Sequence, residues 1–189
     1  VEEVVLDEDG VQDRAAGSTI PQSQVMRVVV SMGMIYFCFK FIRYALDSWG
    51  PMILAEQFQL SGSTAGHISA TFDWIGFMGV VFAGVASDRL FGSRRTPVIF
   101  MMSVGMLACT LALWQFGPSS IWLFAALLGA VGFTLMGPDS LLSGTAAMEV
   151  GNKEFAVVAS GIINGLGSIG PVVQEEIIGY LKSAYGVDA

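Results

Sequence analysis

Three charged side chains lie near the middle of a largely apolar stretch of the chain. Lys40, Arg43 and Asp47 lie within a run from Val25 to Leu54, which is long enough to cross a bilayer at about 20 residues per span. A Lys or Arg near the bilayer centre costs roughly 2.5–3.5 kcal/mol on insertion scales, so such residues face a protein interior or a wet cavity. Spacings of three and four residues place the three side chains on one helix face. This pattern predicts a site for an anion.

The two cations of this face could do different chemistry. The planar fork of Arg43 can form two parallel hydrogen bonds to phosphate oxygens, and Lys40 would add a point charge one helical turn away. The alternative for each is a structural ion pair, for Lys40 with a carboxylate on another span. Asp47 and Asp73 are candidates to hold Arg43 when substrate is absent, and a contact with Asp73 is possible because Arg43 and Asp73 would both lie in the outer half of the membrane.

Composition identifies the class of protein that must position these residues. Of 189 residues, 53% are hydrophobic and only 13% are charged, whereas soluble domains carry about 25% charged residues. The net charge of −7 says little about partners, because six of the sixteen acids fall within the first thirteen residues. We therefore expect the lipid bilayer as the main partner, and no nucleic acid.

Hydropathy predicts an all-α, polytopic membrane helix bundle with five transmembrane helices. The expected spans are residues 25–54, 65–87, 97–116, 121–142 and 155–181. Residues 1–24 are polar and rich in turn formers, so we expect a flexible linker. If that linker is cytoplasmic, its side of the membrane collects six basic residues and the other side only Lys182, which fixes the orientation by the positive-inside rule.

Glycines and prolines predict how the spans pack and bend. Gly76, Gly79 and Gly84 would form a close-packed face of the second span. Pro51 is expected to bend the first span, and Gly137-Pro138-Asp139 to break the fourth. Asp139 could then cap a helix end, interact with the basic loop or act as a gate.

The loop after the second span carries a recognisable pattern of glycines and charges. Its sequence resembles the G-x-x-x-D-[RK]-…-G-[RK]-[RK] signature of the major facilitator superfamily. The matching residues are Gly84, Asp88, Arg89, Gly92, Arg94 and Arg95. The alternative is an ordinary positive-inside loop, in which arginines are held at the cytoplasmic surface.

The first span is similar to the seventh span of the organophosphate:phosphate antiporters within that superfamily. The similar segments are Arg43-Tyr44, Asp47, Trp49-Gly50-Pro51 and, in the next span, Asp73-Trp74. The resemblance implies spans seven to eleven of a twelve-span carrier, with residues 25–189 as a partial C-terminal six-helix bundle lacking its last span. Residues 1–24 would be the central cytoplasmic linker, and the missing N-terminal half a partner.

The same resemblance implies a function and a set of binding residues. It implies a secondary transporter in the cell (inner) membrane that exchanges an organic phosphate for inorganic phosphate by alternating access. Arg43, Lys40, Tyr44 and Asn164 would bind substrate, although helix packing is the alternative for Asn164. Two other readings stay open: a sugar-phosphate sensor of the same fold, and a facilitator that uses Asp47 or Asp73 as a proton site. The residue pattern favours no enzyme, metal or cofactor.

Overall fold

The computed structural model describes residues 22–92, 94–146 and 153–185, and these are helical apart from short connections. The α-helices are α1 (Gln22–Gln57), α2 (Gly62–Ser69), α3 (Thr71–Leu90), α4 (Arg95–Phe116), α5 (Ile121–Ser140) and α6 (Lys153–Tyr185). A 3₁₀ turn, η2 (Gly117–Ser119), precedes α5, and a π-helical segment, η3 (Leu141–Ala146), follows it. Most of the predicted linker 1–24 lies outside the described residues, and its last three residues begin α1.

Five helical segments are long and apolar enough to cross a membrane, which confirms the five predicted spans and the all-α membrane bundle. They are Ser23–Gln57, Gly62–Leu90, Arg95–Ser119, Ile121–Gly144 and Ala156–Ala184. The second span is longer than predicted, because α2 and α3 follow one another with a joint at Ala70. Ser61 accepts a hydrogen bond from the backbone N–H of Thr64 and so caps α2, which shortens the expected polar loop.

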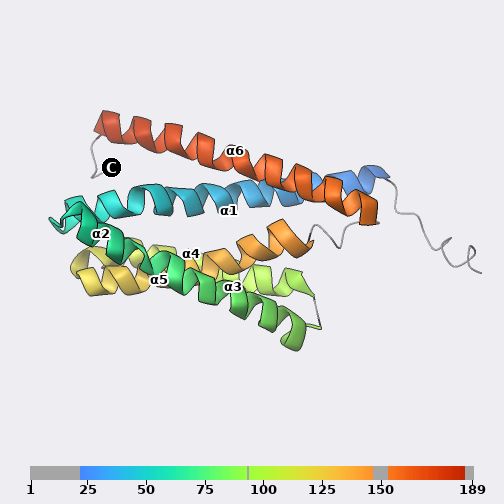
Figure 1. Ribbon diagram of the computed structural model, residues 1–189, viewed down its shortest axis with the longest axis horizontal. Helices are drawn as coiled ribbons and strands as arrows, with labels where there is room; N and C mark the ends of the chain where they lie inside the picture. Colours follow the sequence, from blue (N-terminus) through green and yellow to red (C-terminus); the bar gives the residue numbers. More distant parts are fainter. Residues whose placement is uncertain (1–21, 93, 147–152, 186–189) are drawn as a thin grey trace, which may run out of the picture.

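The helices form two groups that lie side by side (Figure 1). In one group α1 runs parallel to α6, and in the other α3 and α4 pack on α5. Helix α5 is the most buried of the five spans, and its Leu128 and Leu135 are almost completely buried. It is therefore the central helix, against which α1 packs from the first group.

Glycines allow α3 and α5 to approach until their backbones touch. A Cβ atom added to Gly79 would overlap the backbone carbonyl of Phe133, and one added to Gly76 would overlap the side chain of Met136. The predicted packed face is therefore confirmed for these two glycines. It is wrong for Gly84, whose added Cβ would meet nothing within 4 Å, because that position faces away from α5.

Glycines also allow α1 and α6 to approach each other closely. A Cβ on Gly170 would come within 2.6 Å of the carbonyl oxygen of Phe37, and one on Gly167 would overlap the ring of Tyr36. Small residues let two helices approach closely where neighbouring apolar surface gives no hydrophobic driving force, as in a membrane. In each group, two helices therefore approach closely at glycines: α3 and α5 in one group, and α1 and α6 in the other.

Neither proline breaks its helix. Pro51 lies inside α1 and Pro138 inside α5, so the predicted break at Gly137-Pro138-Asp139 is wrong in its position. Helix α5 continues to Ser140 and then widens into the π-helical segment η3. A proline removes one helix hydrogen bond, and in membrane proteins neighbouring helices and local π-helical adjustments accommodate that loss.

Candidate functional site

An ion pair joins the two groups of helices. Nη1 of Arg43 on α1 lies 2.7 Å from Oδ2 of Asp139 on α5. The side chain of Arg43 is 36% exposed, whereas that of Asp139 is only 6% exposed. The guanidinium therefore has one side on the carboxylate and another on an open surface, where a second anion could reach it.

The partner of Arg43 differs from the one that the sequence suggested. Asp47 and Asp73 were the expected partners, but neither forms an ion pair among the described residues. Helix α5 packs on α1 beside Arg43, whereas Asp47 lies four residues, or about 6 Å, farther along the helix axis. Asp139 therefore contacts Arg43 rather than capping a helix end or meeting the basic loop, and the roles of Asp47 and Asp73 stay predictions.

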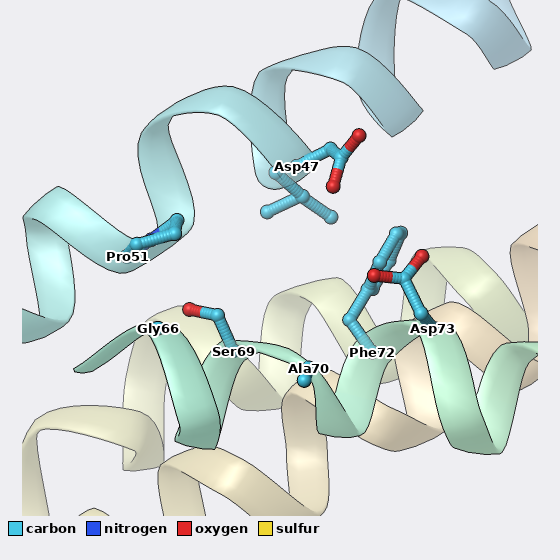
Figure 2. A pocket seen from close by; sticks show the side chains of 8 residues that line it. Asp47, Pro51, Gly66, Ser69, Ala70, Phe72 and Asp73 are labelled. Atoms are coloured by element: carbon cyan, nitrogen blue, oxygen red, sulfur yellow. The ribbon is translucent and has the colours of Figure 1, made fainter. Parts of the chain in front are cut away.

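Asp47 and Asp73 instead share a small pocket between α1 and the α2–α3 joint. The pocket has a volume of about 130 Å³ and is lined by Leu46, Asp47, Pro51, Gly66, Ser69, Ala70, Phe72 and Asp73. Figure 2 shows the two carboxylates facing one another across it. Both residues are exposed at the surface of the bundle.

Lys40 lies one turn before Arg43 and contacts α6. Its ammonium donates a 3.1 Å hydrogen bond to Oγ of Ser168 and lies 4.9 Å from the centre of the Tyr36 ring. These partners are neutral, and within the described ranges no carboxylate forms an ion pair with Lys40. The charge of Lys40 is thus held in place without being neutralised, contrary to the structural ion pair considered above.

Asn164 belongs to the same polar strip of α6. Its side-chain Nδ2 donates to the backbone carbonyl oxygen of Ser160 at 3.0 Å. The backbone carbonyl oxygen of Asn164 accepts from Oγ of Ser168 at 2.8 Å. Ser168 therefore connects Asn164 to Lys40. Tyr44, the fourth predicted binding residue, is 39% exposed on α1 and lies outside this network.

Sequence reasoning missed two contacts of this site. Ser168 was not predicted to touch Lys40, and Tyr36 was not predicted to place its ring against the ammonium. The contact between Tyr36 and Lys40 could have been predicted, because Tyr36 precedes Lys40 by four residues and therefore lies on the same helix face. The contact between Ser168 and Lys40 could not have been predicted, since it depends on how α6 packs on α1.

The loop that carries the signature begins at the end of α3 and ends at the start of α4. Gly92 has a positive φ of 56°, a conformation that glycine adopts without strain. Asp88 and Arg89 lie in the last turn of α3, and Arg94 precedes the first turn of α4. All three are exposed, so the loop presents its charges at one end of the bundle.

A sequence profile described as the Major Facilitator Superfamily matches residues 10–174. The chain is also similar to three curated proteins. It is 29% identical over 157 residues to the membrane sensor protein UhpC of Escherichia coli (strain K12), which covers 80% of this chain and 36% of that protein. It is 26% identical over 165 residues to the sugar phosphate exchanger 3 of Homo sapiens, which covers 84% of this chain and 33% of that protein. It is 30% identical over 146 residues to a probable hexose phosphate transport protein of Chlamydia muridarum (strain MoPn / Nigg), which covers 77% of this chain and 32% of that protein.

The chain spans about a third of the length of these relatives. Together with its five apolar spans, the match over most of its length shows that the chain is an integral multi-pass membrane protein of the Major Facilitator Superfamily.

Proposed function

We propose that this chain forms part of a secondary transporter that exchanges an organic phosphate for inorganic phosphate by alternating access. One observation carries the proposal: the partly exposed guanidinium of Arg43 pairs with a buried carboxylate in the interior of the bundle, with the unneutralised ammonium of Lys40 one turn away. Charged groups at such depth are expensive, and they mark solute paths. Two cations beside one carboxylate suit a doubly negative solute.

Exchange follows from the competition between substrate and Asp139. In the empty state Arg43 donates to Asp139. A phosphate offers the guanidinium more oxygen acceptors and a bidentate geometry, so it can replace the carboxylate. Lys40 then adds its charge. When the substrate leaves, the ion pair forms again, or another phosphate takes its place, which favours exchange over uncoupled leakage.

Orientation, site residues and membrane are part of the proposal. We place Arg27 and the loop between α3 and α4 at the cytoplasmic face of a cell (inner) membrane, because they carry the basic residues. The five spans would correspond to spans seven to eleven of the carrier, and another half-bundle would complete the cavity and move against this one. Tyr44 and Asn164 would contact the substrate, and the chain would catalyse no reaction.

A membrane sensor is the second candidate function. The relative from E. coli is named a membrane sensor protein, and the same cations could recognise a phosphate without moving it. The two functions differ in flux. A sensor would bind phosphate at Arg43 and show no exchange in vesicles.

The test is phosphate exchange by the full-length protein in proteoliposomes loaded with inorganic phosphate. We expect Arg43→Gln to abolish uptake of labelled phosphate, because a neutral amide cannot replace the guanidinium. Arg27→Gln is the matched control, since Arg27 is exposed on the same helix, and it should keep exchange. Wild-type exchange by Arg43→Gln would refute the proposed site, and phosphate binding without flux in the wild type would select the sensor.

A further inference from the structure

One oxygen of the Asp139 carboxylate is left without a partner. Oδ2 accepts from Arg43, whereas Oδ1 is buried and makes no hydrogen bond within the part of the chain that the structure describes. The whole residue is 4% exposed. Buried polar atoms nearly always have a partner, so an orphaned carboxylate oxygen needs an explanation. In the ion-paired state Arg43 compensates the charge of the carboxylate, and Oδ1 is an open position at which a proton can add when Arg43 leaves.

The surroundings of Asp139 offer no second cation to take over from Arg43. Among the described residues, the titratable and charged groups that face Asp139 lie on α1: Tyr36, Lys40 and Arg43. The ammonium of Lys40 is already held by Ser168 and the Tyr36 ring. On the other side, α3 and α4 place the apolar side chains of Ala83 and Met102 next to Gly137, two residues before Asp139.

We propose that Asp139 is a proton-binding site, which takes up a proton from water when Arg43 turns to a bound phosphate. The inference rests on the proposed function. Breaking a buried ion pair on one side leaves an uncompensated charge, which is strongly unfavourable. A buried carboxylate relieves this by becoming neutral. The proton adds to the carboxylate, the hydrogen bond from Arg43 to Asp139 is exchanged for one to phosphate, and one proton enters the site with each anion.

The other groups of the site are unsuited to this role. Arg43 is the group that turns to the phosphate, so it cannot also compensate the charge of Asp139. Asp47 and Asp73 form no ion pair with Arg43 among the described residues, so neither loses a partner when the guanidinium moves. Asp139 is the carboxylate that loses its partner when the guanidinium moves. Coupling between proton and phosphate binding is therefore expected at this residue.

Replacing Asp139 by asparagine separates the two steps. Asp139→Asn resembles the protonated carboxyl, so Arg43 is released without a proton. We expect this variant to bind inorganic phosphate more tightly, on the order of tenfold, because no ion pair has to be broken first. A purely structural counter-ion predicts the opposite, since its loss would disorder Arg43 and weaken binding.

The experiment is titration calorimetry of the full-length protein with inorganic phosphate, at one pH, in buffers of different ionisation enthalpy. The buffer dependence gives the number of protons taken up, and the ionisation of phosphate itself is common to all variants. We expect the wild type to take up about one proton more than Asp139→Asn. Glu56→Gln is the control on α1, because Glu56 pairs with Lys182 away from the site, and it should keep the wild-type number.

Equal proton numbers for the wild type and Asp139→Asn, or weaker phosphate binding by the variant, would overturn the inference. If the variant does not fold, infrared difference spectra of the wild type decide the question: phosphate should produce the carbonyl band of a protonated carboxyl, and its absence would refute the inference. Phosphate binding that depends on Arg43 but involves no extra proton would leave the proposed function standing. Absence of phosphate binding in the wild type would reject both.

Discussion

The ammonium of Lys40 on α1 and the hydroxyl of Ser168 on α6 form a 3.1 Å hydrogen bond. The same hydroxyl donates to the backbone of its own helix at the carbonyl of Asn164, so its orientation is fixed. Lys40 therefore keeps a definite position beside Arg43. Under the proposed function, Ser168 would act as a positioning residue for this cation.

Neutralising Lys40 should weaken phosphate binding without abolishing it. We expect Lys40→Gln to raise the dissociation constant of phosphate about tenfold, since a hydrogen bond to a charged group contributes about 1.5–3 kcal/mol. Ser168→Ala should have a smaller effect in the same direction, because the charge remains and only its position is lost. Equilibrium binding to the full-length protein measures both. Unchanged affinity in Lys40→Gln would remove Lys40 from the site.

A methyl group at Gly79 should destabilise the bundle. The added Cβ would overlap the backbone of Phe133, which cannot move aside as a flexible side chain could. We expect Gly79→Ala to lower the free energy of unfolding by about 1–3 kcal/mol and to lower the melting temperature in detergent. Gly84→Ala is the control on the same helix: its Cβ enters open space, and losing a helical glycine should be neutral or stabilising. Equal melting temperatures for the two variants would contradict the close approach.

The ion pair at the far end of α1 and α6 should contribute little stability. Lys182 lies 3.2 Å from Glu56, and both side chains are partly exposed, so solvent screens the pair. We expect Glu56→Gln to change the free energy of unfolding by less than about 1 kcal/mol. Trp49→Ala should destabilise more, because the indole donates a hydrogen bond to Glu175 and packs near the Lys182 ammonium. Denaturation of the reconstituted protein compares the two, and a larger loss in Glu56→Gln would refute this ranking.

Water should reach the polar strip of α6 but not the outer surface of α4. In a background without Cys38 and Cys109, we expect Asn164→Cys to react with a charged thiol reagent, and bound phosphate to slow that reaction. Leu107→Cys should stay unreactive, because Leu107 is exposed on an apolar helix that can face lipid. Labelling rates in proteoliposomes provide the measurement. Fast labelling at position 107, or no protection by phosphate at position 164, would contradict these assignments.

The spans could be predicted because they depend on local composition. Runs of about 20 apolar residues mark them whatever their neighbours are, and the five segments agree with the structure. The packing role of Gly76 and Gly79 was also accessible, since glycines at helical spacing indicate close approach. Gly84 follows the same pattern but faces open space, because glycine spacing alone does not reveal which positions of a helix face its neighbour.

The pairing of Arg43 with Asp139 could not be predicted from the sequence. The two residues are 96 positions apart, and which helices become neighbours depends on the packing of the whole bundle. Asp139 also follows a proline, which suggested a helix end, whereas the helix continues and then widens. Asp47 and Asp73 were favoured because they are near Arg43 in depth, but depth alone does not determine which side chains touch.

The contact between Arg43 and Asp139 has a mechanical consequence. Glycine contacts join α1 rigidly to α6 and α3 rigidly to α5, and the ion pair connects these two stiff units. Under the proposed function, a solute that draws Arg43 away from Asp139 would remove one contact between the two units. Recognition of the solute and a change in the packing of the bundle would then begin at the same pair of atoms.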